Sequence, residues 1–204
     1  MIKLVVATGN KDKMREIREI FADLPLSIVS MKEIGVVSDP EETGVTFEEN
    51  SLIKARAESS ALAAAGEEGF LVLADDSGLE IDALGKAPGV LSARFMGHDT
   101  SYDVKNAALL EKLKDVSEEK RTARFVCAIS CILPDGTELV KRGTMEGKIG
   151  REIAGDNGFG YDPIFIPDGY TVSSASISPE EKNRISHRGK ALRAMYAELS
   201  QRLA

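Results

Sequence analysis

The feature that most constrains the fold of this chain is the apolar run Phe70–Leu73, which is followed directly by the acidic segment Ala74–Gly78. A short apolar run that ends in residues typical of turns predicts a buried strand. Asp75 and Asp76 would then lie at the end of that strand, where adjacent carboxylates are costly without a positive partner. Mg²⁺ is the usual partner, because it takes oxygen ligands from one or two carboxylates together with substrate phosphates. Tight turns use the same residue types, so this segment alone leaves a turn and a metal site equally open.

Strand and helix signals alternate along the first part of the chain and lead to a hairpin. The spacing of apolar residues predicts strands over 3–7, 26–29 and 70–73, and helices over 11–24, 46–66 and 101–114. Two long strands are predicted over 123–133 and 138–147, and the turn Pro134-Asp135-Gly136 between them indicates an antiparallel hairpin. A last helix begins after Ser178, pauses near 186–189 and continues to the end. We therefore expect an α/β fold with a mixed sheet, in a single domain over 1–204.

Capping signatures mark where three of these helices begin. A Ser or Thr N-cap with an acidic residue three positions later closes the first helical turn. The pairs that fit are Thr46 with Glu49, Thr100 with Asp103, and Ser178 with Glu181, the last with Pro179 at the first helical position.

Composition excludes some classes of function. The 204 residues are 43% hydrophobic and 29% charged, which is typical of a globular protein with a sizeable core. A net charge of −7 argues against a nucleic-acid polymer as partner, although a local group of Lys and Arg can still bind one nucleotide. Without an apolar stretch of roughly 20 residues or a secretory signal, we expect a cytoplasmic protein with no membrane partner. Cys127 and Cys131 would lie about 13 Å apart on one strand face, too far for a disulfide, so both are expected in the core.

The segment Thr8–Lys13 joins the first predicted strand to the first helix. Gly9 allows a sharp turn, and Asn10 suits the N-cap position. Lys13 falls in the first turn, where a cation opposes the helix dipole unless an anion binds at the helix N-terminus. The spacing of a P-loop is absent. Taken alone, the segment is explained more simply by a solvated lysine on a capped helix.

A second group of charged residues lies in and before the next helix. Lys54 follows Asn50 by one turn, so both side chains project from one helix face. Lys54 is either an outward, solvated lysine or a second phosphate ligand. Glu42 in the preceding acidic loop is either a metal ligand or an ordinary loop charge, and spacing decides neither question.

The segment Gly155–Pro163 places three glycines around two aromatic residues and an aspartate. Glycine lets the backbone approach a ligand closely, and an aromatic face stacks well on a base. A glycine-rich turn with core aromatics is the alternative; because only 5% of the chain is aromatic, the clustering favours a base pocket. His187 and Arg188 lie in the last helix, and Arg, a donor only, suits a carbonyl or phosphate oxygen. A lone His is more often structural than catalytic.

Together these segments resemble the inosine triphosphate pyrophosphatases, also called the Ham1 or RdgB-like non-standard purine nucleotide pyrophosphatases. The matches keep the family's order over nearly the whole chain. They are Thr8-Gly9-Asn10…Lys13…Glu16, Glu42-Thr43-Gly44…Phe47…Glu49-Asn50…Lys54, Ala74–Leu79, Pro88-Gly89…Ser92-Ala93-Arg94, Gly158–Pro163 and Lys182…Ser186-His187-Arg188. One departure concerns the glycine-rich loop: the family usually has Gly-Thr-Gly-Gly before Phe, whereas here Gly155 is followed by Asp156-Asn157-Gly158.

The resemblance implies an elongated mixed β-sheet flanked by helices, in two lobes around a central active-site cleft, and a homodimer. It implies a Mg²⁺-dependent hydrolase that converts nucleoside triphosphates to the monophosphate and pyrophosphate. The preferred substrates would be the deaminated purine nucleotides ITP, dITP and XTP, which the enzyme would remove from the nucleotide pool.

The resemblance also assigns roles to residues. Asp76, Asp75 and Lys54 would be catalytic, and Glu42 and Asp76 would hold Mg²⁺. Both aspartates can serve only if the strand ends there, because successive strand residues point to opposite faces. The remaining residues would bind substrate: Thr8, Gly9, Asn10, Lys11, Asp12, Lys13 and Ser77 the triphosphate, and Phe159, Gly160, Tyr161, Asp162, Lys182, His187 and Arg188 the base.

Three other functions remain open at this point. A related pyrophosphatase for a modified pyrimidine is disfavoured by the base-pocket motif and by His187 and Arg188. A nucleotide sensor without catalysis is disfavoured by Asp75, Asp76 and Lys54. A nucleic-acid-binding module is disfavoured by the acidic net charge.

Overall fold

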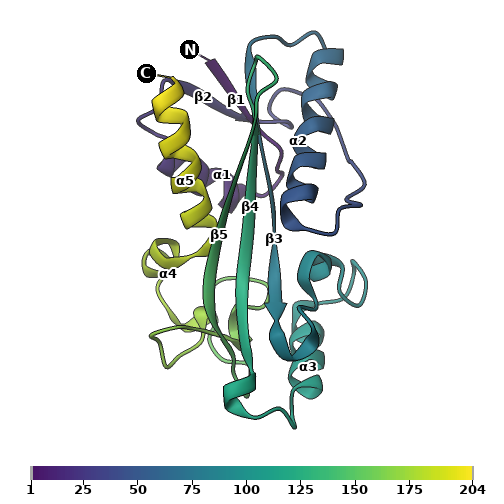
Figure 1. Ribbon diagram of the computed structural model, residues 1–204, viewed down its shortest axis with the longest axis vertical. Coiled ribbons are helices and arrows are strands. Elements are labelled where there is room, and N and C mark those ends of the chain that lie inside the picture. The colour runs from purple at the N-terminus through teal and green to yellow at the C-terminus, as the bar shows by residue number, and fades with distance from the viewer. Residues whose placement is uncertain (1, 204) are drawn as a thin grey trace. The chain divides into compact units, whose positions relative to one another are not determined.

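The computed structural model describes residues 2–203, except for the side chain of Asp12. These residues form a six-stranded sheet in the order β2-β1-β3-β4-β5-β6, together with helices (Figure 1). The strands are β1 (Ile2–Val6), β2 (Leu26–Ser30), β3 (Phe70–Ile81), β4 (Thr122–Ile132), β5 (Glu138–Ile149) and β6 (Phe165–Pro167). The helices are α1 (Lys11–Ile20), α2 (Phe47–Ala64), α3 (Tyr102–Lys112), α4 (Pro179–Ile185) and α5 (His187–Arg202). β1 runs parallel to β2 and β3, and β5 antiparallel to β6, so the predicted α/β fold with a mixed sheet is confirmed.

The chain divides into two compact units, each built from separate segments. Unit 1 contains Met1–Asp76, Cys127–Arg142 and Gly189–Ala204; unit 2 contains Ser77–Val126 and Gly143–Arg188. The chain passes from one unit to the other inside β3, β4, β5 and α5 rather than through a linker. The expectation of a single domain over 1–204 stays a prediction.

The core of unit 1 follows the alternation of β3. Leu71 and Leu73 belong to a cluster with Met14 and Ile17 of α1, Leu192 of α5, and Phe21, which follows α1. Val72 and Ala74 belong to a different cluster, with Ala55 and Leu62 of α2. Because successive strand residues point to opposite faces, Asp75 continues the α1 face and Asp76 continues the α2 face.

In unit 2, Leu109 of α3 and Leu113, the C-cap residue of that helix, belong to a core that also contains Leu79, Ile81, Phe125, Ile149, Tyr161 and Phe165. Phe125 and Phe165 pack edge to face, with ring centroids 4.7 Å apart. This core lies under the glycine-rich segment, since Tyr161 belongs to it.

The prediction that the strand ends at residue 73 is wrong, because β3 continues to Ile81. Gly78 does not form a turn here; it allows a close approach within unit 2. A Cβ at this position would lie 2.4 Å from Ser92 Oγ and 2.5 Å from Gly89 O. Leu79 N donates to the same Ser92 Oγ at 2.9 Å. Gly78, which indicated a turn, therefore allows a contact with another segment of the chain, at Gly89 and Ser92.

Two helix ends also differ from expectation. α1 ends at Ile20 rather than at Leu24, because Leu24 precedes Pro25 and the residue before proline disfavours the helical conformation. α3 is capped by Ser101, whose hydroxyl accepts from Val104 N, while the Thr100 hydroxyl donates to Met96 O at 2.7 Å.

Thr46 and Glu49 form the complete capping box of α2, as predicted. Ser178 caps α4, but the Glu181 carboxylate accepts from Arg184 and Tyr170 instead of completing a capping box. β4 and β5 are joined by a hairpin turn in which Leu133 N donates to Thr137 O at 2.9 Å. Ser186, in an extended conformation, separates α4 from α5.

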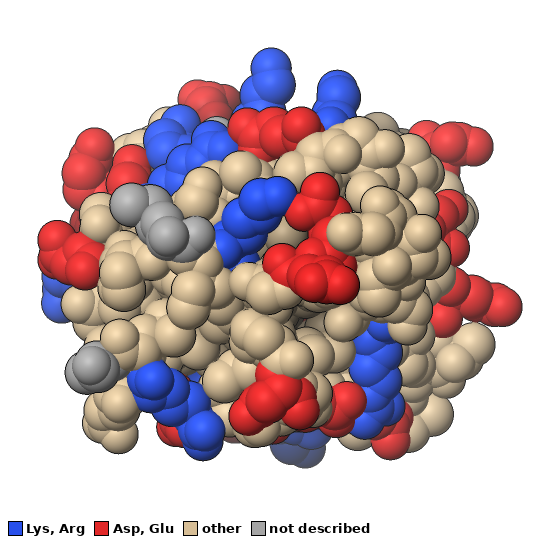
Figure 2. Space-filling model, turned by 90° about the horizontal axis from the view of Figure 1, so that it is seen from above, with Lys and Arg blue, Asp and Glu red and all other residues tan. Residues whose placement is uncertain are grey.

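Both cysteines are fully buried in unit 1, as predicted, and burial raises the pKa of the Cys131 thiol to about 12. Over residues 2–203, none of the helices is both long enough and apolar enough to span a membrane. On the face seen in Figure 2, acidic and basic side chains are interspersed among uncharged ones.

Candidate active site

Unit 1 brings together charged side chains that were far apart in the sequence. Lys54 Nζ lies 2.7 Å from Glu42 Oε1 and donates to the backbone carbonyl of Asp75 at 3.0 Å. Lys13 Nζ lies 2.8 Å from one carboxylate oxygen of Asp75 and 3.0 Å from the other. Lys54, Glu42, Lys13 and the aspartates of β3 form the group that we call the carboxylate–lysine cluster.

The two aspartates have different surroundings within this cluster. Asp75 is paired with Lys13 of α1, whereas Asp76 lies near Asn50 of α2, whose side chain lowers the pKa of Asp76. Because β3 does not end between them, the condition under which both would act at one point is not met. Asp76 lies on the face of β3 that packs against α2, and α2 also supplies Lys54.

Asp76 is a buried carboxyl with a raised pKa. Burial, and after it the charge of Glu42, raise its pKa to about 6 against the opposing effects of Lys54 and Asn50. A carboxyl with a pKa near neutrality accepts a proton readily at physiological pH, which is what a general base must do. This places Asp76 among the residue types found at reacting centres.

Neither lysine of the cluster is a freely solvated surface lysine. The side chains of Lys13 and Lys54 are each only 21% exposed. Burial by itself would lower the pKa of Lys54, but the charges of Asp75 and Glu42 outweigh it and raise that pKa. Lys54 therefore stays positively charged at all pH values at which the protein would work, and the interpretation of either residue as a solvated lysine is wrong.

The turn before α1 has the predicted capping geometry. Asn10 Oδ1 accepts from Lys13 N, and Asn10 N donates to Thr8 Oγ1, each at 3.2 Å. Gly9 and Lys11 are exposed. The side chain of Asp12, also predicted to bind substrate, lies outside the described residues.

The carboxylates of Glu42 and Asp76 decide whether a cation fits in the carboxylate–lysine cluster. The charge of Glu42 raises the pKa of Asp76, so a cation between the two side chains would relieve their repulsion. Among the described residues, no group of three or more His, Cys, Asp and Glu is arranged to hold a metal. Two carboxylates, completed by water and substrate phosphates, are the ligand set that Mg²⁺ usually takes.

Glu58 lies one turn after Lys54 and is 5% exposed, and its Oε2 has no hydrogen-bond partner among the described residues. Burial raises its pKa, the charge of Asp39 adds to this, and Lys54 opposes it. The folded state therefore holds this proton more tightly than the unfolded state, and stability falls as pH rises through the folded pKa. We expect Glu58→Gln to raise the Tm at pH 8 and the gain to shrink toward pH 4. Thermal unfolding at both pH values checks this; a gain of equal size at both would contradict it.

In unit 2, Asp162 organises the glycine-rich loop. Its buried carboxylate accepts from Phe159 N at 2.8 Å and from Ser174 Oγ at 3.1 Å, and it pairs with Lys182. The ion pair with Asp162 thus fixes the position of the Lys182 side chain. Gly158 leaves room for this pair, since a Cβ there would lie 2.4 Å from Asp162 Oδ2 and 2.9 Å from Lys182 Nζ.

Phe159 is the one aromatic side chain of the loop that faces solvent, with 55% exposure. Two cations lie near its ring: Lys182 Nζ at 5.1 Å and Arg188 Cζ at 5.9 Å from the centroid. Tyr161 instead is buried in the core and donates to Ser92 O at 2.7 Å, and burial raises the pKa of its hydroxyl. Of the two readings of this segment, Phe159 fits a base platform and Tyr161 fits a core aromatic.

His187 and Arg188 begin α5 after the break at Ser186. The imidazole of His187 stacks on Phe125, with ring centroids 4.9 Å apart and planes inclined by 13°. Arg188 Nη2 lies 3.4 Å from Ser77 Oγ. In unit 2 the structure thus brings together Phe159, Asp162, Lys182 and Arg188, which we call the ring–cation cluster, and places Ser77 beside Arg188.

We expect Gly158→Ala to disturb the ring–cation cluster. Its φ of +78° is strained for alanine by roughly 1–2 kcal/mol, and the new Cβ would displace Asp162 or Lys182. Gly136→Ala is the matched control, because Gly136 has a φ of +85° but nothing within 4 Å of its Cβ position. Both variants should lose stability by thermal unfolding, but only Gly158→Ala should weaken binding of a purine nucleotide; equal binding in the two would contradict this.

Two residues of α3 that support this loop were not among the predicted site residues. Lys105 and Asn106 are buried, and they donate to Ala93 O at 2.7 Å and to Gly160 O at 3.1 Å. The signal was present, because both precede the core residue Leu109 at helical spacing, where an apolar residue would be expected.

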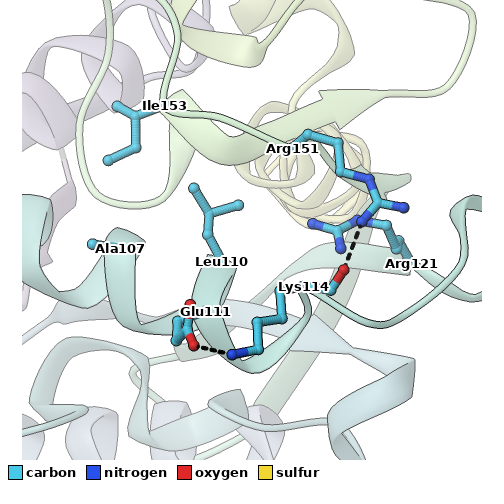
Figure 3. A pocket seen from close by; sticks show the side chains of 7 residues that line it. All are labelled: Ala107, Leu110, Glu111, Lys114, Arg121, Arg151 and Ile153. Carbon is cyan, nitrogen blue, oxygen red and sulfur yellow. Dashed lines mark hydrogen bonds and ion pairs between the residues drawn. The ribbon is translucent and has the colours of Figure 1, made fainter.

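Unit 2 also has a pocket of about 520 Å³ near the end of α3, shown in Figure 3. Its lining residues are Ala107, Leu110, Glu111, Lys114, Arg121, Arg151 and Ile153. Lys114 pairs with Glu111, and Arg121 and Arg151 donate to backbone carbonyls. No predicted site residue lines this pocket. Its Lys and Arg side chains stabilise the local structure through the contacts just described.

Comparison with known proteins places the chain in a family. The model of the Ham1 family matches residues 4–198. A dITP/XTP pyrophosphatase of Exiguobacterium sibiricum is 47% identical over 199 residues, with 98% of each chain covered. Another, of Cutibacterium acnes, is 48% identical, with 96% of this chain and 95% of that protein covered. The solved structure of a HAM1 protein from Coxiella burnetii matches with a TM-score of 0.89 at 40% identity, covering 98% of this chain and all (100%) of that one. The chain therefore belongs to the Ham1 family.

Proposed function

We propose that this protein hydrolyses the deaminated purine nucleotides dITP, ITP and XTP to the monophosphate and pyrophosphate. The observation that carries the proposal is the buried Asp76, with its raised pKa, beside Glu42 and Lys54. Relatives that match nearly the whole chain are named dITP/XTP pyrophosphatases, which supports the same reaction here.

The carboxylate–lysine cluster suits attack of water on the α-phosphorus. Asp76 takes a proton from the water, the new bond joins the water oxygen to phosphorus, and the bond to the bridging oxygen of the β-phosphate breaks. Lys54, and Lys13 at the N-terminus of α1, offer positive charge to the triphosphate, together with Thr8 and Asn10. We propose that Glu42 and Asp76 hold Mg²⁺, which neutralises phosphate charge when bound.

The ring–cation cluster suits a purine with oxygen at position 6. Phe159 stacks on the base, and Lys182 and Arg188, with His187 beside them, donate hydrogen bonds to a keto oxygen. A 6-amino group would present a donor to these donors, so adenine is rejected. Guanine also carries a 6-keto oxygen, so this edge alone does not exclude GTP.

The test is pyrophosphate release from ITP, dITP, XTP, GTP, ATP and dTTP in the presence of Mg²⁺, with a parallel series in EDTA. We expect release from ITP, dITP and XTP, little from ATP or dTTP, and none in EDTA. Release of orthophosphate would move the attack to the γ-phosphorus and overturn the mechanism. Tight binding of ITP without turnover would instead support a sensor.

We also propose a homodimer in the cytoplasm, on the resemblance alone. Sedimentation equilibrium tests the first part, and fractionation of the cells that make the protein tests the second. A monomer at micromolar concentration would contradict the dimer.

A further inference from the structure

One face of α3 carries three residues that contact the loops of unit 2. Tyr102, Lys105 and Asn106 are spaced i, i+3 and i+4, so their side chains lie on the same face of the helix. Lys105 and Asn106 are each only 1% exposed. Burying an ammonium group and an amide is costly unless both are hydrogen-bonded. The hydrogen bonds that Lys105 and Asn106 donate therefore explain why polar residues are found at these buried positions.

These contacts fix two loop segments. Lys105 Nζ donates to Ala93 O at 2.7 Å, and Asn106 Nδ2 donates to Gly160 O at 3.1 Å. The Tyr102 ring packs edge to face on Tyr161, with centroids 5.2 Å apart and planes at 86°. Tyr161 in turn donates to Ser92 O at 2.7 Å, next to the residue that Lys105 holds.

Asn106 uses only part of its hydrogen-bonding capacity. Its Oδ1 is buried and has no partner among the described residues, which costs stability. The opposite orientation of the amide would place Oδ1 against the carbonyl oxygen of Gly160. Donation to Gly160 O is therefore the interaction that a buried amide provides here.

The loop that Asn106 contacts has a glycine on each side of Phe159. Gly158 and Gly160, on either side of Phe159, have φ values of +78° and +68°, and glycine adopts many conformations. Phe159 itself is largely exposed, so packing alone does not fix its ring. Its backbone is fixed on the two sides by Asp162, which accepts from Phe159 N, and by Asn106, which donates to Gly160 O.

We infer that Asn106, with Lys105 and Tyr102 on the same face of α3, is a positioning residue that orients Phe159 for stacking on the purine base. The inference rests on the proposed function for the identity of the ligand. Asn106 acts through Gly160 and the loop, and it does not itself touch the substrate.

The test is Asn106→Leu, which keeps the volume of the side chain and removes both the donor and the unpartnered acceptor. The chain contains no tryptophan, so Phe159→Trp provides a single fluorescent reporter on the loop. Adding Asn106→Leu to the reporter variant should lower the fluorescence anisotropy of the indole in the free protein. In the chain that keeps Phe159, Asn106→Leu should weaken binding of inosine monophosphate by roughly five- to tenfold, the equivalent of one hydrogen bond, and leave pyrophosphate binding unchanged.

Leu109→Ala is the matched control, because Leu109 is fully buried on the same helix but belongs to the core below the loop. It should lower the Tm without changing the anisotropy or the ratio of the two affinities. Asn106→Asp, which keeps the shape and loses the donor, serves if the leucine variant does not fold. Unchanged anisotropy in both Asn106 variants would overturn the inference. Failure of the unsubstituted protein to release pyrophosphate from ITP would overturn the proposed function alone, because the anisotropy needs no ligand.

Discussion

Replacing Asp76 with asparagine is expected to lower kcat for pyrophosphate release from ITP by roughly 10²–10⁴-fold, the usual contribution of a general base. Asparagine has nearly the same shape but cannot accept the proton from water, and it is a weaker ligand for a cation. Initial rates at saturating ITP and Mg²⁺ measure the effect.

The same substitution is expected to stabilise the protein. The pKa of Asp76 is raised from 3.8 to about 6 in the folded state, so the folded protein binds this proton more tightly than the unfolded chain. Stability is therefore lost as pH rises from about 4 through 6, and the loss persists above that range. Asp76→Asn should recover up to about 3 kcal/mol at pH 8 in EDTA, and the gain should vanish near pH 4. Loss of activity with a gain in stability is the result expected for a group retained for chemistry.

Asp75→Asn is the matched control, since Asp75 is the neighbouring residue of β3 but faces Lys13 of α1. Its substitution removes one partner of an ion pair, so a loss of stability is expected. We expect a larger effect on KM than on kcat, because Lys13 is proposed to bind phosphate. Equal loss of kcat in the two variants would contradict the separate roles of the two aspartates.

The opposite surroundings of these aspartates show what the sequence could and could not predict. Alternation along β3 follows from its apolar residues, so the faces of Asp75 and Asp76 follow once the strand is known to continue. The residues after Asp76 are typical of turns, so they predicted that the strand ends there. Gly78 is instead needed for its contact with Ser92, a residue distant in the sequence. The local conformational propensity of a residue gives no information about a contact of this kind.

The same limit applies to side-chain partners. The capping box at Thr46 and Glu49 was predictable because its two residues interact within one helical turn. The partners of Lys54, by contrast, come from a loop and from β3, so spacing left open whether the lysine was solvated. Asn106 was missed for a related reason, because its partner Gly160 belongs to a loop 54 residues away.

Replacing Lys54 with methionine is expected to have the second largest effect, a fall in kcat/KM of roughly 10²–10³-fold, comparable to the loss of one preorganised charge at a reacting centre. Methionine keeps the length of the side chain and removes its charge. Glu42 then loses the cation that lies 2.7 Å away, and the carbonyl of Asp75 loses a donor. Steady-state kinetics with ITP measure the loss.

The pH dependence distinguishes this explanation from simple loss of a phosphate ligand. Lys54 lowers the pKa of Asp76, against the effects of burial and of Glu42. Without Lys54 the pKa of Asp76 should rise, so the acid limb of the kcat profile should move to higher pH. Lys13→Met is the control: it should raise KM and leave the acid limb in place, because the partner of Lys13 is Asp75. An acid limb that does not move in Lys54→Met would mean that Asp76 does not set the pH dependence of the reaction, and that the lysine acts on the substrate alone.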